Sequence, residues 1–255
     1  MCIRDRGTYW CKLRVRGTPG HASMPYKTDN ALVKAAEVVR RLHAYKPPTT
    51  ISDVWRGFVD GMRFDPVLRE VLLDSAKLDE LIDGLPIGQA RMFHSCTHTT
   101  IAPTILHGGV KTNIIPDTVE IQVDVRTLPG ETAEETRAML QDALGDLSDA
   151  VEIAEDNPFE SGASPMDTPL WDVLSKVTRA IIPEAETVPF LIVGATDARY
   201  FRKLGVTSYG YGLLSERIPF NEFAQMFHGD NERVDQESLR LSTELWEQTA
   251  RALLA

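Results

Sequence analysis

A histidine near the C-terminus carries the clearest chemical signal in this chain. His228 lies in the loop sequence FHGDNER, residues 227–233. A neutral imidazole binds Zn²⁺ at about 2.0 Å while its second nitrogen is held by a hydrogen-bond acceptor. A single loop histidine is more often a packing residue, here beside Phe227. Metal ligation and packing are therefore both open at this point.

A second histidine, His21, follows the glycine- and proline-rich sequence GTPG at residues 17–20. Such a turn allows tight backbone dihedral angles and can hold a side chain outward from a sheet. The alternative is an exposed turn histidine without a role. The turn alone does not decide between these two interpretations of His21.

Three further polar residues are candidates for contact with a substrate. Asn113 precedes the sequence IIP, and Arg126 closes the next predicted strand thirteen positions later. Arg199 lies three residues into a predicted helix, whose N-terminus favours anions. A guanidinium group suits a carboxylate because it donates two parallel hydrogen bonds. The alternatives are an asparagine that holds its own turn, an arginine that solvates a sheet edge and, for Arg199, pairing with a neighbouring acid.

His94, Cys96 and His98 alternate along a segment that we predict to be a strand. All three side chains would then project from one face, and histidines two positions apart on a strand can chelate zinc. No fourth ligand is evident, and a polar strand edge explains the same spacing. We therefore expect no metal site there.

The elements of residues 8–155 follow the order strand, helix, insertion, strand, strand, helix, strand. This is the order of a split β-α-β fold, with the two middle strands pairing antiparallel. Residues 49–93 form the insertion, which is helical in part and to which the sequence assigns no role. The predicted elements are strand 8–15, a helix capped by Asp29 with Leu32, Ala35, Val39 and Leu42 on one face, strands 97–106 and 118–125, a helix that begins with a capping box at Thr132–Glu135, and strand 151–154.

The remaining residues, 156–255, have an α/β pattern. A continuous apolar run at 188–193 predicts a buried parallel strand. Two strands are too few for a sheet covered on both faces, so we expect further strands from a segment that precedes this chain. The other predicted elements are a helix after Thr168-Pro169, a helix from Asp197 to Gly205, strand 206–211 and a terminal helix capped by Asp235.

Composition limits the classes of function. The formal net charge of −10 and a pI near 5.1 argue against a nucleic-acid or anionic-membrane surface. No apolar run is long enough to span a bilayer, and the N-terminus lacks the apolar core of a secretory signal, so we expect a cytoplasmic location. The three cysteines lack CxxC spacing and are expected to be free thiols.

The first six residues, MCIRDR, show no capping, periodic or turn pattern. They are similar to translated adapter DNA at the edge of an assembled fragment. We therefore interpret residues 1–6 as a non-native leader and leave them out of the predicted fold.

Several sequence motifs occur together in one order along the chain. They are GTPGHASMP at 17–25, TNIIPD at 112–117, VDVR at 123–126, GATDARYF at 194–201 and FHGDNER at 227–233. With them the chain resembles an M20-family metallopeptidase, of the group of aminoacylases, succinyl-diaminopimelate desuccinylases and glutamate carboxypeptidases. The resemblance covers nearly everything after Arg6. It corresponds to the lid domain, a ferredoxin-like βαββαβ dimerisation domain at 7–155, followed by the C-terminal part of the α/β catalytic domain at 156–255.

The resemblance implies a role for each candidate residue. Such enzymes hydrolyse amide bonds at a di-zinc centre, in which a glutamate acts as general base. His228 matches a metal ligand, and His21 matches the lid histidine that donates a hydrogen bond to the developing oxyanion in a partner subunit's active site. Asn113 and Arg126 match lid positions that contact substrate, and Arg199 is a second candidate contact for a carboxylate.

The chain also departs from the family, because only one of the expected metal ligands is present. We expect it to be an N-terminally truncated fragment that is inactive alone. The alternative is a non-catalytic dimerisation or interaction module. The implied partners are a small N-acyl amino acid or peptide and a second copy of the chain that pairs through the lid. The implied metal is Zn²⁺, with Co²⁺ or Mn²⁺ as alternatives, and the substrate subclass is open.

Overall fold

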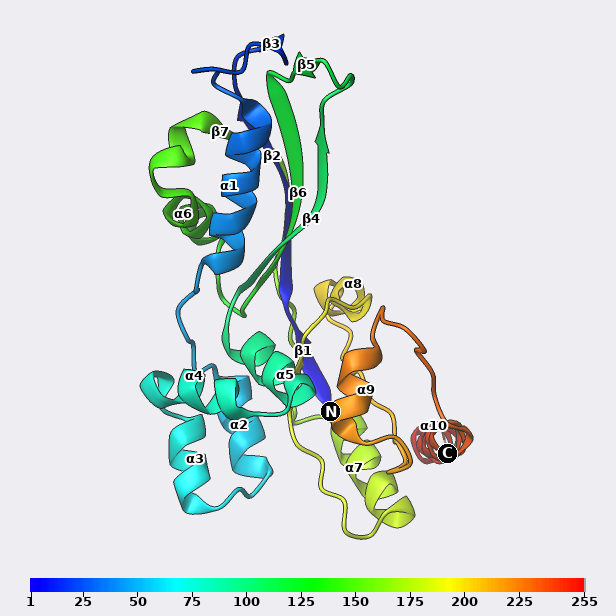
Figure 1. Ribbon diagram of the computed structural model, residues 1–255. Helices are drawn as coiled ribbons and strands as arrows, with labels where there is room; N and C mark the ends of the chain where they lie inside the picture. Colours follow the sequence, from blue (N-terminus) through cyan, green and yellow to red (C-terminus); the bar gives the residue numbers. More distant parts are fainter. Residues whose placement is uncertain (255) are drawn as a thin grey trace. The chain divides into compact units, whose positions relative to one another are not determined.

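A computed structural model describes residues 1–254 (Figure 1). The chain divides into two compact units. Unit 1 contains residues 1–6, 49–98 and the segment from Gly162 onward. Unit 2 contains residues 7–48 and 99–161. The predicted insertion 49–93 therefore lies in the same unit as the C-terminal segment.

Unit 2 is built on a four-stranded antiparallel sheet with the order β4-β6-β2-β7. Along the chain the order of its main elements is β2, α1, β4, β6, α6, β7, which gives the ferredoxin-like arrangement expected from the sequence. The strands are β2 (Gly7–Arg16), β4 (Thr100–Gly108), β6 (Thr118–Thr127) and β7 (Val151–Phe159), and a short pair is formed by β3 (Gly20–His21) and β5 (Ile114–Ile115).

The core of unit 2 follows from the alternation of buried residues along its two central strands. Successive side chains of a strand point to opposite faces, so every second residue of β2 and β6 is buried. Helices α1 (Ala31–Ala44) and α6 (Ala133–Leu144) cover that face, and α6 leads into the 3₁₀ turn η1 (Gly145–Ala150) (Figure 1). The buried strand residues are Tyr9, Cys11, Leu13, Val15, Val119, Ile121, Val123 and Val125.

Helix α1 differs in detail from the prediction. Its N-cap is Asn30, whose side chain accepts a hydrogen bond from the Leu32 backbone, while Asp29 forms an ion pair with Lys34. Ala31, Ala35, Val38 and Leu42 form the buried face, and Leu32 is exposed. The predicted capping box at Thr132 is confirmed, with both reciprocal bonds to Glu135 present.

Unit 1 combines one small sheet with eight helices among the residues that the structure describes. Strand β1 (Cys2–Asp5) runs parallel to β8 (Phe190–Ile192). Met1 and Leu213 join the apolar residues of α7 and α10 in one hydrophobic core. The helices are α2 (Asp53–Gly61), α3 (Pro66–Leu72), α4 (Ser75–Gly84), α5 (Ile87–Thr97), α7 (Pro169–Ile181), α8 (Ala198–Lys203), α9 (Phe220–Met226) and α10 (Gln236–Leu254).

Two strand predictions in unit 1 need correction. Residues 1–6, left out of the predicted fold, supply β1, and Asp5 at its end is buried. The predicted strand 206–211 does not form; Gly210 makes only an isolated bridge to Cys2. The backbone N–H of Ser208 donates to the Ser164 side chain, and its C=O accepts from the Arg202 side chain, so neither group pairs with a strand. The predicted strand 188–193 is confirmed as the shorter β8.

A third correction concerns residues 94–98. They do not lie on a strand: 87–97 form helix α5, and β4 begins only at Thr100. Phe93 of α5 packs on Trp55 and Phe58 of α2, with the Trp55–Phe93 ring centroids 5.1 Å apart. This aromatic burial explains why the helix wins over a five-residue polar alternation.

Two composition-based expectations can be compared with the structure. The three cysteines are free thiols, as expected. None of the described helices is both long enough and apolar enough to cross a membrane.

Candidate functional site

His21 lies in a short turn at one end of unit 2, and backbone hydrogen bonds hold this turn in place. It pairs with Ile114 between β3 and β5, and its carbonyl accepts a hydrogen bond from Met24 N–H at 2.9 Å. The side chain is exposed, and its Nδ1 atom faces Ser23. The turn that the sequence predicted therefore presents the imidazole outward.

The loop that carries this turn is fixed by backbone contacts. Gly17 N–H donates to the backbone carbonyl oxygen of Asp117 at 2.8 Å, and Thr18 N–H donates to that of Asp29 at 2.7 Å. A Cβ atom at Gly17 would lie 2.4 Å from the Asp29 carbonyl oxygen and 2.6 Å from the Ala31 nitrogen. Only glycine permits this approach, so Gly17 closes the loop onto the start of α1.

Asn113 is a neighbour of His21, whereas Arg126 is not. Ala22 N–H donates to the Asn113 carbonyl oxygen at 3.0 Å, so Asn113, which immediately precedes β5, lies beside the residue that follows His21. Arg126 lies at the opposite end of β6 from Thr118, about 27 Å along the strand at 3.4 Å per residue. Unit 2 therefore brings together two of its three candidates.

The Arg126 guanidinium is held within its own unit. It donates to both carboxylate oxygens of Asp124, at 2.6 and 2.8 Å, and lies 5.7 Å from the Trp10 ring centroid. A bidentate ion pair over an aromatic face orients the planar fork. A substrate carboxylate would have to share this fork with Asp124.

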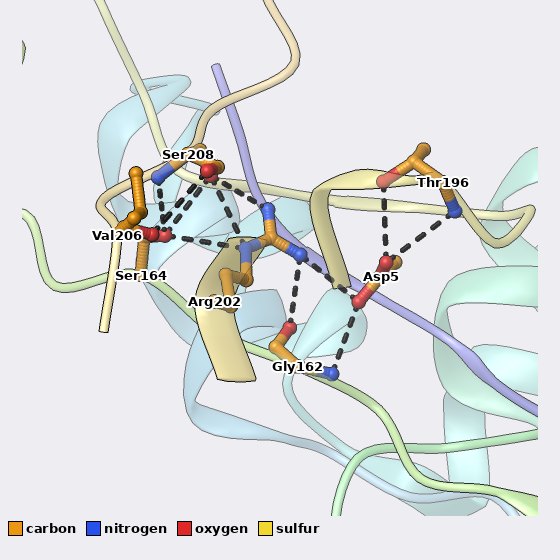
Figure 2. A network of polar contacts seen from close by, with 7 residues as sticks. All are labelled: Asp5, Gly162, Ser164, Thr196, Arg202, Val206 and Ser208. Carbon is orange, nitrogen blue, oxygen red and sulfur yellow. Dashed lines mark hydrogen bonds and ion pairs between the residues drawn. The ribbon is translucent and has the colours of Figure 1, made fainter. Parts of the chain in front are cut away.

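In unit 1, a buried ion pair fixes the segment that carries Arg199 (Figure 2). Arg202 of α8 donates to Asp5 Oδ1 at 3.0 Å, and the two side chains are only 5% and 1% exposed. The second Asp5 oxygen accepts from Thr196 N–H and Oγ1. Asp5 therefore binds both sides of the turn that leads into α8.

The other end of Arg202 completes this network. Its Nε and Nη2 donate to the Ser208 carbonyl oxygen at 3.2 and 2.8 Å, and Ser164 Oγ accepts from Ser208 N–H (Figure 2). Gly162 N–H donates to Asp5 at 3.0 Å. Charged groups in a protein interior need such a complete set of partners. Neither Asp5, which lies in the residues interpreted as a leader, nor Arg202 stands in a sequence pattern that predicts this network.

Arg199 lies one residue into α8, and its guanidinium group lies 5.0 Å from the ring centroid of Tyr200. Its Nη2 donates to the Tyr200 hydroxyl at 3.2 Å. Asp197, with which the predicted helix begins, is the N-cap residue of α8 but makes no side-chain capping bond. Arg199 therefore takes its position from the Asp5 network and its neighbouring ring.

His228 lies in the loop after α9, with a left-handed backbone at φ +55°. Its N–H donates to Glu232 at 3.2 Å, and Arg233 forms an ion pair with Glu222. A left-handed conformation is uncommon for a residue other than glycine and asparagine. Phe227, the residue on which His228 packs in the alternative interpretation, stacks edge-to-face on Phe223 at 5.0 Å between ring centroids.

Helix α9, which leads into this loop, is seated on α5. Gly88 N–H donates to Asn221 Oδ1 at 2.8 Å. A Cβ atom at Gly88 would lie 2.4 Å from the Asn221 carbonyl oxygen, so the two helices meet at a point that only glycine allows. The segment to which the sequence assigned no role thus supports the element before His228.

His94 and Cys96 lie on α5 and His98 is its C-cap, so the three residues do not alternate along a strand. His94 and His98 stack with ring centroids 4.3 Å apart, while Cys96 faces the Leu191 carbonyl oxygen. His98 Nε2 lies 3.0 Å from Asp79. Burial lowers the pKa of His94 to about 4, and the nearby His98 and Arg6 act in the same direction.

The described residues do not fit a complete metal centre. Among residues 1–254 no group of three or more His, Cys, Asp or Glu side chains is arranged to hold a metal ion. Zinc sites in enzymes take at least three protein ligands. His228 would therefore be a single ligand, and no step of a reaction can be built on a metal from these residues alone.

Comparison with protein families gives two matches that overlap. Residues 3–152 match the model of the peptidase dimerisation domain. Residues 80–252, more than half of the chain, match the model of peptidase family M20/M25/M40. The first match includes His21, Asn113 and Arg126, and the second includes all of these except His21, together with Arg199 and His228.

Individual relatives are more distant. The N-fatty-acyl-amino acid synthase/hydrolase PM20D1 of Xenopus tropicalis is 26% identical over 251 residues, which are 95% of this chain and 47% of the relative. Mouse aminoacylase-1 is 24% identical over 236 residues, covering 91% of this chain and 47% of the enzyme. The chain therefore spans about half the length of these relatives.

Solved structures share the fold. Human carnosine dipeptidase 1 superimposes with a TM-score of 0.63 at 10% sequence identity, covering 97% of this chain and 55% of that one. A metallo-carboxypeptidase of the M20 family from Sulfolobus solfataricus gives a TM-score of 0.59 at 13% identity, covering 97% of this chain and 58% of that one.

Proposed function

Because the chain belongs to peptidase family M20/M25/M40, we propose that it forms part of a metal-dependent hydrolase of amide bonds. One observation carries this proposal. The His21 turn, which backbone hydrogen bonds hold in place, and the His228 loop both lie within the family matches, in that order along the chain. His21 lies in a turn closed by a backbone hydrogen bond, and His228 has a left-handed backbone conformation.

In this proposal the His21 imidazole donates a hydrogen bond to the carbonyl oxygen of the scissile amide as negative charge develops on it. The support is its exposure on a turn fixed at Gly17, Asn113 and Met24. A donor placed in advance contributes more than one that must reorganise, and losing one such donor costs roughly 100- to 1000-fold in rate. His21 would act in the active site of a partner subunit.

The proposed substrate is an N-acyl amino acid or small peptide with a free carboxylate. PM20D1 relatives are named for N-fatty-acyl-amino acids, and aminoacylase-1 is a second relative. Arg126 and Arg199 are the cations proposed to contact the carboxylate, with Asn113 beside His21 as a further polar contact. An arginine fork fits a carboxylate in a bidentate way.

The proposed metal is Zn²⁺, two ions in a complete centre, with Co²⁺ or Mn²⁺ as alternatives. His228 is assigned one ligand position, and the remaining ligands are proposed to lie outside this chain, because residues 1–254 do not provide them as a group. We expect the 255-residue chain alone to be inactive.

The proposed assembly is a homodimer through unit 2. The match to a peptidase dimerisation domain supports it, as does the free edge of the sheet at β4. Ile105 and Leu106 of this edge strand are each 43% exposed. An apolar sheet edge is suited to pairing with another chain, and sedimentation of the purified chain measures this directly.

The test starts from the complete reading frame that contains this chain. The encoded protein is purified, its metal content is measured by mass spectrometry, and hydrolysis is assayed with N-acyl amino acids and dipeptides. Two metal ions per subunit and turnover that falls at least about 100-fold in His228→Ala are expected. His43→Ala, an exposed helix residue of unit 2, is the matched control and should keep full activity.

Two outcomes would overturn the proposal. A complete protein that binds no metal and hydrolyses no amide would favour the dimerisation module instead. Full turnover in the 255-residue chain alone would show that the ligand set has been assigned wrongly.

A further inference from the structure

The His21 ring has a specific neighbour that no sequence motif pointed to. Ser23 places two groups at the Nδ1 atom: its hydroxyl oxygen lies 2.7 Å away, and its backbone nitrogen, which donates, lies 3.2 Å away. Both groups come from the β-turn that the Met24 N–H closes onto the His21 carbonyl oxygen. The contact is therefore part of the turn itself.

The backbone contact decides which ring nitrogen carries the proton. A hydroxyl can rotate to donate or accept, so the Ser23 hydroxyl alone fits either tautomer. A backbone N–H only donates, and two N–H groups cannot point at each other. Nδ1 must therefore be the unprotonated acceptor, and in the neutral ring the proton lies on Nε2.

The Nε2 atom is left available for a ligand. Among residues 1–254 it has no hydrogen-bond partner, and the side chain is exposed. A neutral imidazole with its proton on Nε2 donates a hydrogen bond from that atom without carrying a positive charge. This is the state that a donor to a developing oxyanion requires.

We propose that Ser23 is a positioning residue that holds His21 in the Nε2–H tautomer, so that Nε2 is the donor to substrate. The tautomer assignment stands on the contacts of Ser23 alone. Its catalytic consequence rests on the function proposed above for His21.

Nitrogen NMR on the purified 255-residue chain, labelled with ¹⁵N-histidine, tests the tautomer without any need for activity. The His21 signals are identified by their loss in His21→Gln. Couplings from the ring protons show which nitrogen is protonated. His43, which is exposed on α1 and whose ring has no hydrogen-bond partner among the described residues, serves as the internal reference.

We expect the ratio of Nε2–H to Nδ1–H forms to be higher at His21 than at His43. Ser23→Ala should lower this ratio about fivefold, the equivalent of one ordinary hydrogen bond. The reason is that the Ser23 N–H repels an Nδ1–H ring from this position, so the hydroxyl bond also forms only with the Nε2–H tautomer. Ser23→Thr keeps the hydroxyl and should restore the ratio. Ser148→Ala, in the same unit, is the matched control, because the Ser148 side chain makes no hydrogen bond within residues 1–254. An Nδ1–H form at His21, or an unchanged ratio in Ser23→Ala, overturns the proposal.

A second readout uses the complete enzyme. Ser23→Ala should lower kcat about fivefold with KM unchanged, and Ser23→Thr should recover kcat, because the donor matters only as charge develops. If the tautomer shifts as expected while neither Ser23→Ala nor His21→Asn changes kcat, the tautomer assignment stands and the proposed catalytic role of His21 fails. If kcat falls while the tautomer does not change, Ser23 does not act through the tautomer.

Discussion

In unit 2 the charged side chains lie on the open face of the sheet, whereas in unit 1 the central ion pair is buried. Lys12, Arg14 and Arg16 of β2 alternate with the core residues and pair with glutamates of β6 and β7 at 2.9 to 3.8 Å. Asp5 and Arg202 instead lie inside their unit, with exposed fractions of 1% and 5%.

The difference shows two ways of defining a fold. The register of β2 against β6 is already set by the alternation of apolar residues, so the surface pairs add little. Unit 1 is assembled from three separate segments of the chain, and its sheet has only two strands. There the Asp5–Arg202 network joins β1 to the segments at Gly162, Thr196 and Ser208.

The largest effect is expected from Asp5→Ala. Arg202 would keep its place in the interior without a carboxylate, and breaking a buried pair in this way costs about 3–5 kcal/mol of the free energy of unfolding. Hydrogen exchange should show lost protection in unit 1 while the strands of unit 2 keep theirs. Asp167→Ala, an exposed residue of unit 1, is the matched control. Equal loss in both units would contradict the comparison.

An intermediate effect is expected from acid. Burial lowers the pKa of His94 to about 4 from an ordinary 6.5, so between these pH values the unfolded chain takes up a proton that the folded chain does not. The free energy of unfolding of unit 1 should therefore fall as the pH drops from about 6.5 to 4. Below about pH 4, His94 should contribute no further change.

Urea unfolding followed by tryptophan fluorescence at several pH values measures this dependence. His94→Gln should flatten the curve in that window, and His43→Gln should not. A steep fall that persists in His94→Gln would assign the acid sensitivity to other groups.

The smallest effect is expected from Arg14→Gln. Arg14 contacts Glu120 at 3.2 Å and Glu152 at 3.4 Å, but on the exposed face of the sheet, where solvent screens both pairs. The melting temperature should stay within error of the unchanged protein. A fall as large as that of Asp5→Ala would show that the surface pairs of unit 2 hold the sheet together.

Much of unit 2 was predictable from local patterns. Alternation predicts β2 and β6, and the capping box at Thr132 marks a helix start that the structure confirms. The caps at Thr168 and Asp235 do the same for two helices of unit 1. These signals work because each depends on residues within one turn or one strand.

The errors in unit 1 have a common cause, which is dependence on distant residues. Strand β1 has four residues, and its partner β8 begins at Phe190, far along the chain. The run 206–211 has strand-like composition, but Arg202 and Ser164 take up its backbone groups. The polar alternation at 94–98 is too short to outweigh the aromatic contacts of Phe93.

The candidate site shows the same division. Family motifs single out His21 and Asn113, and the structure places Asn113 beside the His21 turn, where Ala22 N–H donates to its carbonyl oxygen. Arg126 was grouped with them, although it lies at the other end of β6. Ser23 was missed because a contact from a side chain to a ring two residues away leaves no sequence signature beyond a small polar residue.

The seat of α9 on α5 has a consequence for recombining this chain with its relatives. Gly88 and Asn221 lie 133 residues apart in sequence, yet they fit each other at a contact that excludes even a methyl group. A chimera that takes the His228 loop from one parent and residues 49–98 from another would combine two surfaces that were selected separately. These two stretches should therefore be inherited as one block, even though a crossover between them would look harmless in the linear sequence.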